Sequence, residues 1–256
     1  MEALILAGGL GTRLRPLLND RPKSIAPIAG RPFLEYLLQK LRRHGISDII
    51  LSVGYQAEMI QAYFGDGSRW DLQLKYSLED TPLGTAGAVK LAQRLLQGDT
   101  FLVLNGDSFF DLDLQDFVTQ HHAHGAAASL ALASIPNPQR YGTVEINQQG
   151  QILRFLEKDS ATQTGGQGLI SAGVYLFHRT VLDKIPPGKS VSLERETFPA
   201  LIGERFYGIP YQAFFLDIGI PSDYQKLQDE PGPLLAQIST YRAVPGAGSP
   251  DMEIQS

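Results

Sequence analysis

Two kinds of hydrophobic pattern alternate along the first 135 residues of the chain. Short apolar or alternating runs predict strands, and they cover residues 3–6, 48–53, 72–77, 100–104 and 126–134. Segments with apolar residues at helical spacing predict helices, and they cover residues 32–44, 57–64, 86–96 and 114–124. Because strands alternate with helices, we predict a parallel sheet joined by right-handed crossovers.

After residue 135 the pattern becomes richer in strands. Predicted strands cover residues 142–146, 151–157 and 171–177, and predicted helices cover residues 192–201 and 222–229. We therefore predict an α/β fold with a mostly parallel central sheet, flanking helices and a strand-rich second half. The predicted domain spans residues 1–230, with one half at residues 1–135 and the other at residues 136–230.

The last segment, residues 231–256, contains four prolines and no sustained apolar period. It predicts a loosely attached tail. A second interpretation is that Leu234, Leu235 and Ile238 form a short helix that packs on a partner subunit. A homo-oligomer therefore remains open.

Composition narrows the classes of function. The chain has 256 residues and no cysteine, which excludes disulfides, thiol catalysis and cysteine-ligated metal. Its net charge of −5 disfavours nonspecific binding to nucleic acid or to an anionic membrane, so we expect neither partner. No leader-like segment precedes the first predicted strand, and the sequence contains no long apolar run. We therefore expect a cytoplasmic protein.

A glycine-rich stretch follows the first predicted strand. Glycines at positions 8, 9 and 11 are followed by Arg13, Arg15 and Lys23. Such a backbone can form an anion-binding nest, and the cations suit a polyphosphate. Leu14 replaces the third glycine of a dinucleotide-binding fingerprint, and no Lys-Ser or Lys-Thr completes a P-loop. An ordinary surface turn is the alternative interpretation.

An aspartate and a cluster of histidines are the candidate metal ligands in the sequence. Asp107 follows the strand at 100–104, and open α/β sheets bind ligands at the carboxyl ends of their strands. A carboxylate at that position suits Mg²⁺. His121, His122 and His124 crowd the end of a predicted helix. We interpret them as solvated residues near a helix C-terminus, where the helix dipole favours cations, and not as a metal site.

The glycine-rich stretch resembles the signature of the sugar nucleotidyltransferases, G-G-x-G-T-R-L-x-P followed by P-K. Further segments similar to this family occur in family order, at residues 79–87, 105–107, 155–158, 171–173 and 215–224. Ser24 and Ser171 depart from the family pattern, which usually has Pro and Asn at these positions. The resemblance covers residues 2–229 and implies the Rossmann-like fold of nucleotide-diphospho-sugar transferases.

The resemblance also implies which residues form the site. Catalytic roles fall to Arg13, Lys23, Asp107 and Lys158. The nucleotide would be bound by Leu6, Ala7, Gly8, Gly9, Gly11, Thr12, Arg13, Glu79, Gly84, Thr85 and Asn105. The sugar phosphate would be bound by Gly142, Glu157, Lys158, Ser171, Ala172 and Gly173. Asp107 and Asp217 would hold Mg²⁺, with Mn²⁺ as a substitute.

The implied reaction joins a nucleoside triphosphate and a sugar 1-phosphate to give a nucleotide sugar and pyrophosphate. Within the family the similarity implies GTP and a D-glycero-α-D-manno-heptose 1-phosphate as the substrate pair. Mannose 1-phosphate is the nearest alternative sugar, and UTP, dTTP or CTP are alternative nucleotides. A non-catalytic, sugar-nucleotide-binding regulatory subunit is an alternative of another class. Such a subunit is expected to have lost Arg13, Lys23 or a metal-binding aspartate, and all are present.

Overall fold

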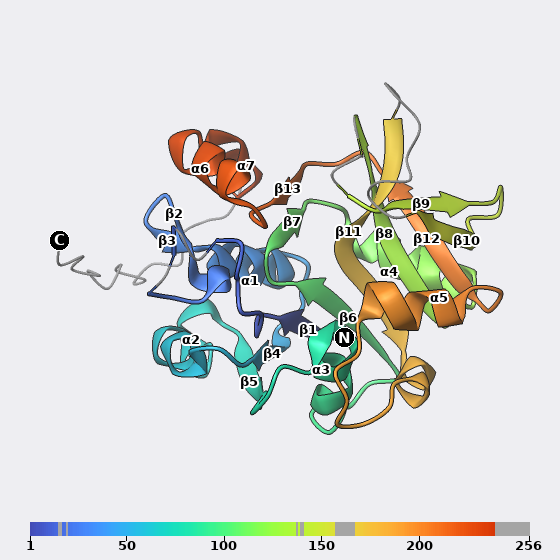
Figure 1. Cartoon of the computed structure of the whole chain (residues 1–256), viewed down its shortest axis with the longest axis horizontal. Coiled ribbons are helices and arrows are strands. Elements are labelled where there is room, and N and C mark those ends of the chain that lie inside the picture. The colour runs from blue at the N-terminus through green and yellow to red at the C-terminus, as the bar shows by residue number, and fades with distance from the viewer. Residues whose placement is uncertain (15–16, 19, 137, 139–140, 157–166, 239–256) are drawn as a thin grey trace.

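The computed structural model describes residues 1–238 except for 15–16, 19, 137, 139–140 and 157–166. Within this part, nine strands form one central sheet (Figure 1). They are β1 (Glu2–Leu6), β4 (Asp48–Val53), β5 (Gln73–Leu78), β6 (Thr100–Asn105), β8 (Ala128–Pro136), β9 (Thr143–Ile146), β10 (Ile152–Leu156), β11 (Gln167–His178) and β12 (Phe206–Tyr211). Two small antiparallel ribbons pair β2 (Pro27–Ile28) with β3 (Arg31–Pro32), and β7 (Ser108–Phe110) with β13 (Phe215–Asp217).

The helices are α1 (Phe33–Arg43), α2 (Ala57–Phe64), α3 (Gly84–Ala92), α4 (Leu114–Ala123), α5 (Phe198–Leu201), α6 (Pro221–Asp229) and α7 (Gly232–Ile238). A π-helical turn, Leu193–Thr197, leads directly into α5. No helix in the described part of the chain has both the length and the apolar character needed to cross a bilayer.

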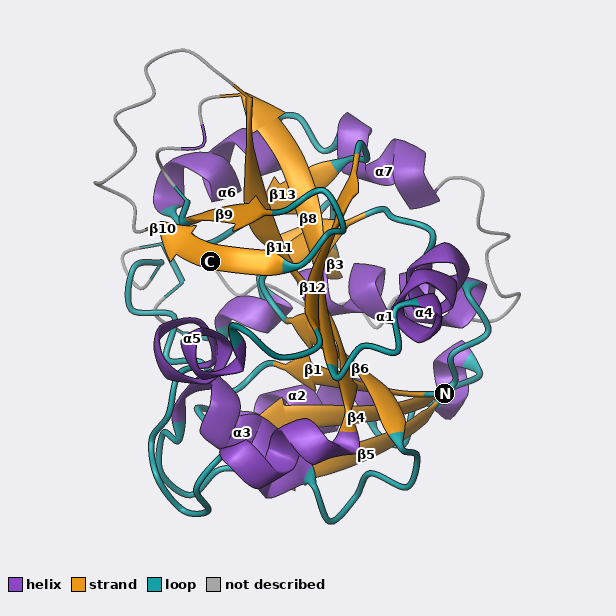
Figure 2. Cartoon of the chain, turned by 90° about the vertical axis from the view of Figure 1, so that its right-hand side faces the viewer, coloured by secondary structure: helices purple, strands orange, loops and turns teal. Residues whose placement is uncertain are grey.

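Strand β1 lies at the centre of a parallel group with the order β6-β1-β4-β5. Its side chains alternate between two cores: Ala3 and Ile5 pack with α1 and α2, whereas Leu4 packs with α3. Both faces of the sheet are covered, with α1 and α4 on one side and α3 and α5 on the other (Figure 2). Burial on both faces explains why β1 and β4 are apolar runs and not alternating patterns.

The second half of the chain extends the same sheet. Strand β11 pairs antiparallel with β6, and β8 pairs antiparallel with β11. The predicted fold, a mostly parallel α/β sheet with flanking helices and a strand-rich second half, is confirmed. Strand β12 was not predicted, because Gly208 and Pro210 interrupt its apolar run. It pairs with β8 at the margin of the sheet, where a missing backbone N–H is tolerated.

The expectation of a loose tail from residue 231 is wrong for residues 232–238, which form α7. Leu234 is fully buried and Ile238 is 7% exposed, and both belong to the core that contains α1. These side chains are buried within their own chain, so they are not free to pack on a partner. The second interpretation, a short helix at Leu234, Leu235 and Ile238, is therefore confirmed for the helix itself. Residues 239–256 lie outside the described residues.

Candidate active site

The glycine-rich loop begins where β1 ends, at the carboxyl edge of the parallel strands. Leu6 ends β1, and Ala7 continues the pairing through its N–H to the carbonyl of Ser52 at 2.8 Å. A Cβ on Gly8 would lie 2.6 Å from a carboxylate oxygen of Glu79. Gly11 has a positive φ of 57°, which favours glycine. The loop therefore runs close to the neighbouring strands with its backbone unshielded by side chains.

Lys23 and the two predicted metal-binding aspartates meet beside this loop. Lys23 Nζ lies 2.6 Å from Asp107 Oδ2. Asp217 is on β13 opposite Ser108, and the N–H of Ile218 donates to the carbonyl of Asp107 at 3.0 Å. The pairing of β7 with β13 thus brings together two aspartates from distant parts of the chain.

These aspartates share one positive side chain. Burial, followed by the negative charge of Asp107, raises the pKa of the Asp217 carboxyl. Lys23 supplies one positive charge to a group that contains two carboxylates. The ion pair between Lys23 and Asp107 therefore leaves a carboxylate charge that a further cation can balance. Carboxylate oxygens are the ligands that Mg²⁺ prefers. The donor set therefore fits a small divalent cation held by Asp107 and Asp217.

Arg13 is exposed in the glycine-rich loop. Its guanidinium makes no ion pair or hydrogen bond with any residue that the structure describes. Gly9 and Thr12, which belong to the same loop, are also exposed. An unpaired guanidinium next to a bare backbone loop can contact phosphate in a bidentate manner. Arg15, the next cation in the sequence, lies outside the described residues.

A second loop, residues 79–83, leads into α3 and lies close to the glycine-rich loop at Gly8. Gly84 and Thr85 begin α3, and the Cβ that Gly84 lacks would lie 2.5 Å from the carbonyl oxygen of Val191. Glu79 precedes this loop, and its carboxylate accepts hydrogen bonds from Ser52 Oγ and Leu83 N, both at 3.1 Å. Glu79 thus links β4 to the loop that leads into α3.

The predicted sugar-side residues lie next to the end of β6. Strand β11 has a register irregularity at Ser171–Tyr175, and Gly173 has a positive φ of 72°. A Cβ on Gly173 would lie 2.4 Å from Ser108 Oγ and 3.0 Å from Asn105 Cβ. Ser171 and Ala172 are therefore brought beside Asn105. Gly142 directly precedes β9, whose Thr143 pairs with Ile170 on β11.

Some expectations fall outside the structure or need correction. Glu157 and Lys158 lie outside the described residues, so their roles stay predictions. Ser24, where the family usually has Pro, is buried with a hydroxyl that has no hydrogen-bond partner among the described atoms. The expectation that the histidines of α4 are all solvated is wrong for His121, which is 2% exposed and bonds Ser129 Oγ at 2.9 Å. Burial lowers the pKa of His121 to about 4.

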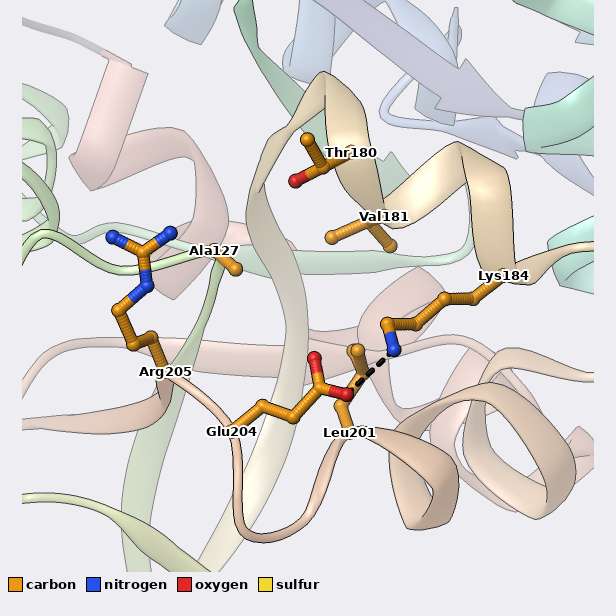
Figure 3. Close-up of a pocket in the computed structure, with 7 residues that line it drawn as sticks. All are labelled: Ala127, Thr180, Val181, Lys184, Leu201, Glu204 and Arg205. Atoms are coloured by element: carbon orange, nitrogen blue, oxygen red, sulfur yellow. Dashed lines mark hydrogen bonds and ion pairs between the residues drawn. The ribbon is translucent and has the colours of Figure 1, made fainter.

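Among the residues that the structure describes, no group of three or more His, Asp or Glu side chains is arranged to hold a metal ion. A shallow cavity of about 430 Å³ lies away from the predicted site (Figure 3). It is lined by Ala127, Thr180, Val181, Lys184, Leu201, Glu204 and Arg205. Lys184 and Glu204 form an ion pair of 2.5 Å at this cavity. None of the predicted site residues lines this cavity.

Comparison with known proteins decides the family. The chain matches the family model described as nucleotidyl transferase over residues 2–230. The chain belongs to this family. A D-glycero-alpha-D-manno-heptose 1-phosphate guanylyltransferase from Aneurinibacillus thermoaerophilus is 38% identical over 231 residues, which cover 90% of this chain and 98% of the relative.

Two further similarities bear on the choice within the family. A mannose-1-phosphate guanylyltransferase from Mycobacterium tuberculosis is 39% identical over 227 residues, which cover 88% of this chain and 62% of the relative. The crystal structure of HddC from Yersinia pseudotuberculosis superimposes with a TM-score of 0.79 at 32% identity, covering 90% of this chain and 98% of that one. The resemblance inferred from the sequence motifs is therefore confirmed. The two named relatives are sugar 1-phosphate nucleotidyltransferases.

Proposed function

We propose that this protein transfers a nucleoside monophosphate from a nucleoside triphosphate to a sugar 1-phosphate and releases pyrophosphate. The observation that carries the proposal is the cluster of Lys23, Asp107 and Asp217 next to the glycine-rich loop. An oxygen of the sugar phosphate attacks the α-phosphorus in line, and pyrophosphate leaves. The attacking group is already an anion, so the protein needs to position and neutralise charges more than to move protons.

The chain's own side chains divide this task. Arg13 is assigned to the β- and γ-phosphates that leave, because its guanidinium is exposed beside the loop. Lys23 is assigned to the α-phosphate region. Asp107 and Asp217 would hold Mg²⁺, which supplies charge neutralisation at the α-phosphate. Lys158 is assigned to the attacking sugar phosphate on the basis of its sequence motif alone.

The proposed substrate pair is GTP with D-glycero-α-D-manno-heptose 1-phosphate. Support comes from the heptose 1-phosphate guanylyltransferase, which this chain matches over 98% of that relative's length. The structural neighbour HddC has also been crystallised in complex with GMP-PN. Mannose 1-phosphate is the second candidate sugar, because a mannose-1-phosphate guanylyltransferase is similar at 39% identity.

A pyrophosphate-release assay tests the reaction and the pair together. GTP, UTP, dTTP, CTP and ATP are each combined with heptose, mannose and glucose 1-phosphates in the presence of Mg²⁺. We expect the highest kcat/KM for GTP with the heptose substrate. A higher kcat/KM for mannose 1-phosphate would select the second candidate. Binding of nucleotide sugars without pyrophosphate release from any pair would instead favour the regulatory subunit.

A further inference from the structure

A second cavity, of about 200 Å³, lies at the edge of the sheet opposite to the candidate active site. It is lined by Thr100, His121, His122, Gly125, Ala126, His178 and Arg205. Thr100 begins β6, and Asn105, which belongs to the candidate active site, ends it. Five steps along a strand separate the two residues by about 17 Å. The cavity is therefore separate from the proposed catalytic groups.

Backbone hydrogen bonds hold the walls of this cavity together. The N–H of Ala126 donates to the carbonyl of His121 at the end of α4, at 3.1 Å. The N–H of His178 donates to the carbonyl of Ala127 at 2.8 Å, and the N–H of Ala127 donates to the carbonyl of Arg205 at 2.8 Å. The end of α4, the start of β8, the end of β11 and the segment before β12 thus meet at residues 126–127. The shape of the cavity is set by the fold.

Arg205 brings a positive charge to the cavity, and no carboxylate lines it. Arg205 is exposed, and its guanidinium makes no ion pair or hydrogen bond with any residue that the structure describes. Its Nη1 lies 3.8 Å from the position that a Cβ on Gly125 would take, which places the guanidinium beside the cavity. Figure 3 shows it directed away from the ion pair of Lys184 and Glu204. Its charge is therefore available to an anion.

Two imidazoles of the cavity use Nδ1 within the protein and leave Nε2 for a ligand. Nδ1 of His178 accepts a hydrogen bond from the N–H of Thr180 at 3.3 Å, so the neutral ring carries its proton on Nε2. Nδ1 of His121 lies 2.9 Å from Ser129 Oγ. When the Ser129 hydroxyl donates to this nitrogen, Nε2 of His121 also carries the proton. Each ring then offers an N–H donor to the cavity.

The histidines lack a counter-charge. Burial, and then the charges of His122 and His178, lower the pKa of His121 to about 4. The three rings therefore resist becoming charged together. Asp99 and Glu204, the acidic residues next in sequence to the lining, do not line the cavity themselves. An anion in the cavity would supply the missing negative charge.

We propose that this cavity is a second anion site, which binds a phosphate group. The donors are the guanidinium of Arg205 and the Nε2–H groups of His121 and His178. They come from three different elements, an arrangement that suits a tetrahedral oxyanion better than a planar carboxylate. The cavity of about 200 Å³ is several times the roughly 30 Å³ that a water molecule occupies, so it has room for a phosphate group. This site does not depend on the proposed function.

The test follows the imidazole NMR signals of the full chain during titration with sulfate at pH 6 and pH 8, at constant ionic strength. Sulfate is a tetrahedral dianion that keeps its charge over this range, so any dependence on pH comes from the protein. We expect saturable shifts at His121, His122 and His178. Binding should be about 10-fold tighter at pH 6, because imidazole becomes cationic as the pH falls. His44 is the internal control, since it lies near Asp113 at the other end of α4, about 15 Å away.

Arg205→Gln removes the guanidinium and should weaken sulfate binding about 10- to 150-fold. Arg205 is exposed and pairs with β8 through its main chain, so this variant should keep the fold. Arg94→Gln, which changes another exposed arginine, is the matched control and should bind sulfate like the unmodified chain. Equal affinity of the two variants would overturn the proposal. Equal shifts at His44 and at the three cavity histidines, or acetate binding as tight as sulfate binding, would also overturn it.

Inorganic phosphate and mannose 1-phosphate distinguish two sources of the phosphate group. The cavity shares Arg205 with the neighbouring cavity of about 430 Å³, whose walls include Val181 and Leu201. Tighter binding of mannose 1-phosphate, measured at the signals of His122 and His178, would indicate that the body of an organic phosphate occupies the neighbouring cavity. Equal or weaker binding would identify free phosphate as the ligand. No saturable shift with either compound would contradict the site.

Discussion

Lys23 and Asp107, 84 residues apart in sequence, form an ion pair of 2.6 Å at the carboxyl edge of the sheet. The Lys23 side chain is 12% exposed and that of Asp107 is 41% exposed, so the pair lies at the rim of the site. In the proposed reaction both groups have other partners: phosphate for the lysine and a divalent cation for the aspartate. We infer that the ion pair holds the two side chains in place and that substrate and cation separate them.

The first prediction concerns Asp107. Asp107→Asn removes a charged oxygen donor, so turnover should fall by several orders of magnitude, while binding of the nucleotide without metal should be largely kept. EDTA should abolish the activity of the unmodified chain, and Mg²⁺ or Mn²⁺ should restore it. Steady-state rates over a Mg²⁺ titration measure the effect. Asp99→Asn, at the opposite end of β6, is the control. Full activity of Asp107→Asn at saturating Mg²⁺ would contradict the assignment.

The second prediction separates the two phosphate sites. Arg13→Ala should mainly weaken use of the triphosphate, whereas Lys158→Ala should mainly raise KM for the sugar 1-phosphate. Each lost contact between a charged side chain and phosphate should cost about 1.5–3 kcal/mol, or roughly 10- to 150-fold. KM values for both substrates distinguish the two variants, and Arg94→Ala, which changes an exposed arginine just after the C-terminal end of α3, is the control. A change confined to the KM for GTP in Lys158→Ala would show that Lys158 is on the nucleotide side.

The sequence predicted the parallel strands and the glycine-rich loop because these features are local. Residues 48–53 and 57–64 were predicted with the bounds that the structure has for β4 and α2. The approach of Asp107 to Asp217 could be inferred only through family motifs, because the β7–β13 pairing that creates it joins two three-residue strands. Residues 192–201 were predicted as one helix, whereas the structure has a π-helical turn at Leu193–Thr197 followed by α5. The close approach of Val191 to Gly84, which positions this turn, is a tertiary contact that the local pattern does not contain.

The third prediction concerns the end of the chain. Removing everything after Glu230 deletes α7 and exposes the surface that Leu234 and Ile238 cover. The burial of each such side chain contributes about 1.5–3 kcal/mol, so the truncated chain should have a clearly lower midpoint of thermal unfolding. A chain that ends at Ile238 keeps the helix and should unfold like the full chain. Equal midpoints for the two truncations would show that α7 adds no stability.

The last prediction uses the buried Lys40 of α1. Its ammonium donates to the carbonyl of Phe110, the last residue of β7, and lies 5.5 Å from the centre of the Phe109 ring. Lys40 is 1% exposed, and burial lowers its pKa to about 7 from an ordinary value of 10.5. Between these two pH values the unfolded chain binds a proton that the folded chain has released. The free energy of unfolding should therefore rise with pH across this interval, because the cost of burying the charged amine is present below pH 7 and disappears above it.

Lys40→Met keeps the aliphatic volume and removes the titrating group. The rise in the free energy of unfolding between pH 7 and pH 10, on the order of 3 kcal/mol in the unmodified chain, should be absent from this variant. At pH 10 the variant should also be the less stable of the two proteins, since the carbonyl of Phe110 is left without its donor. Urea denaturation at pH 7, 8, 9 and 10 measures both effects, with Lys226→Met on the exposed face of α6 as the control. If Lys40→Met and Lys226→Met showed the same dependence on pH, Lys40 would not titrate in this interval, and the ammonium would stay charged beneath the ribbon that carries Asp217.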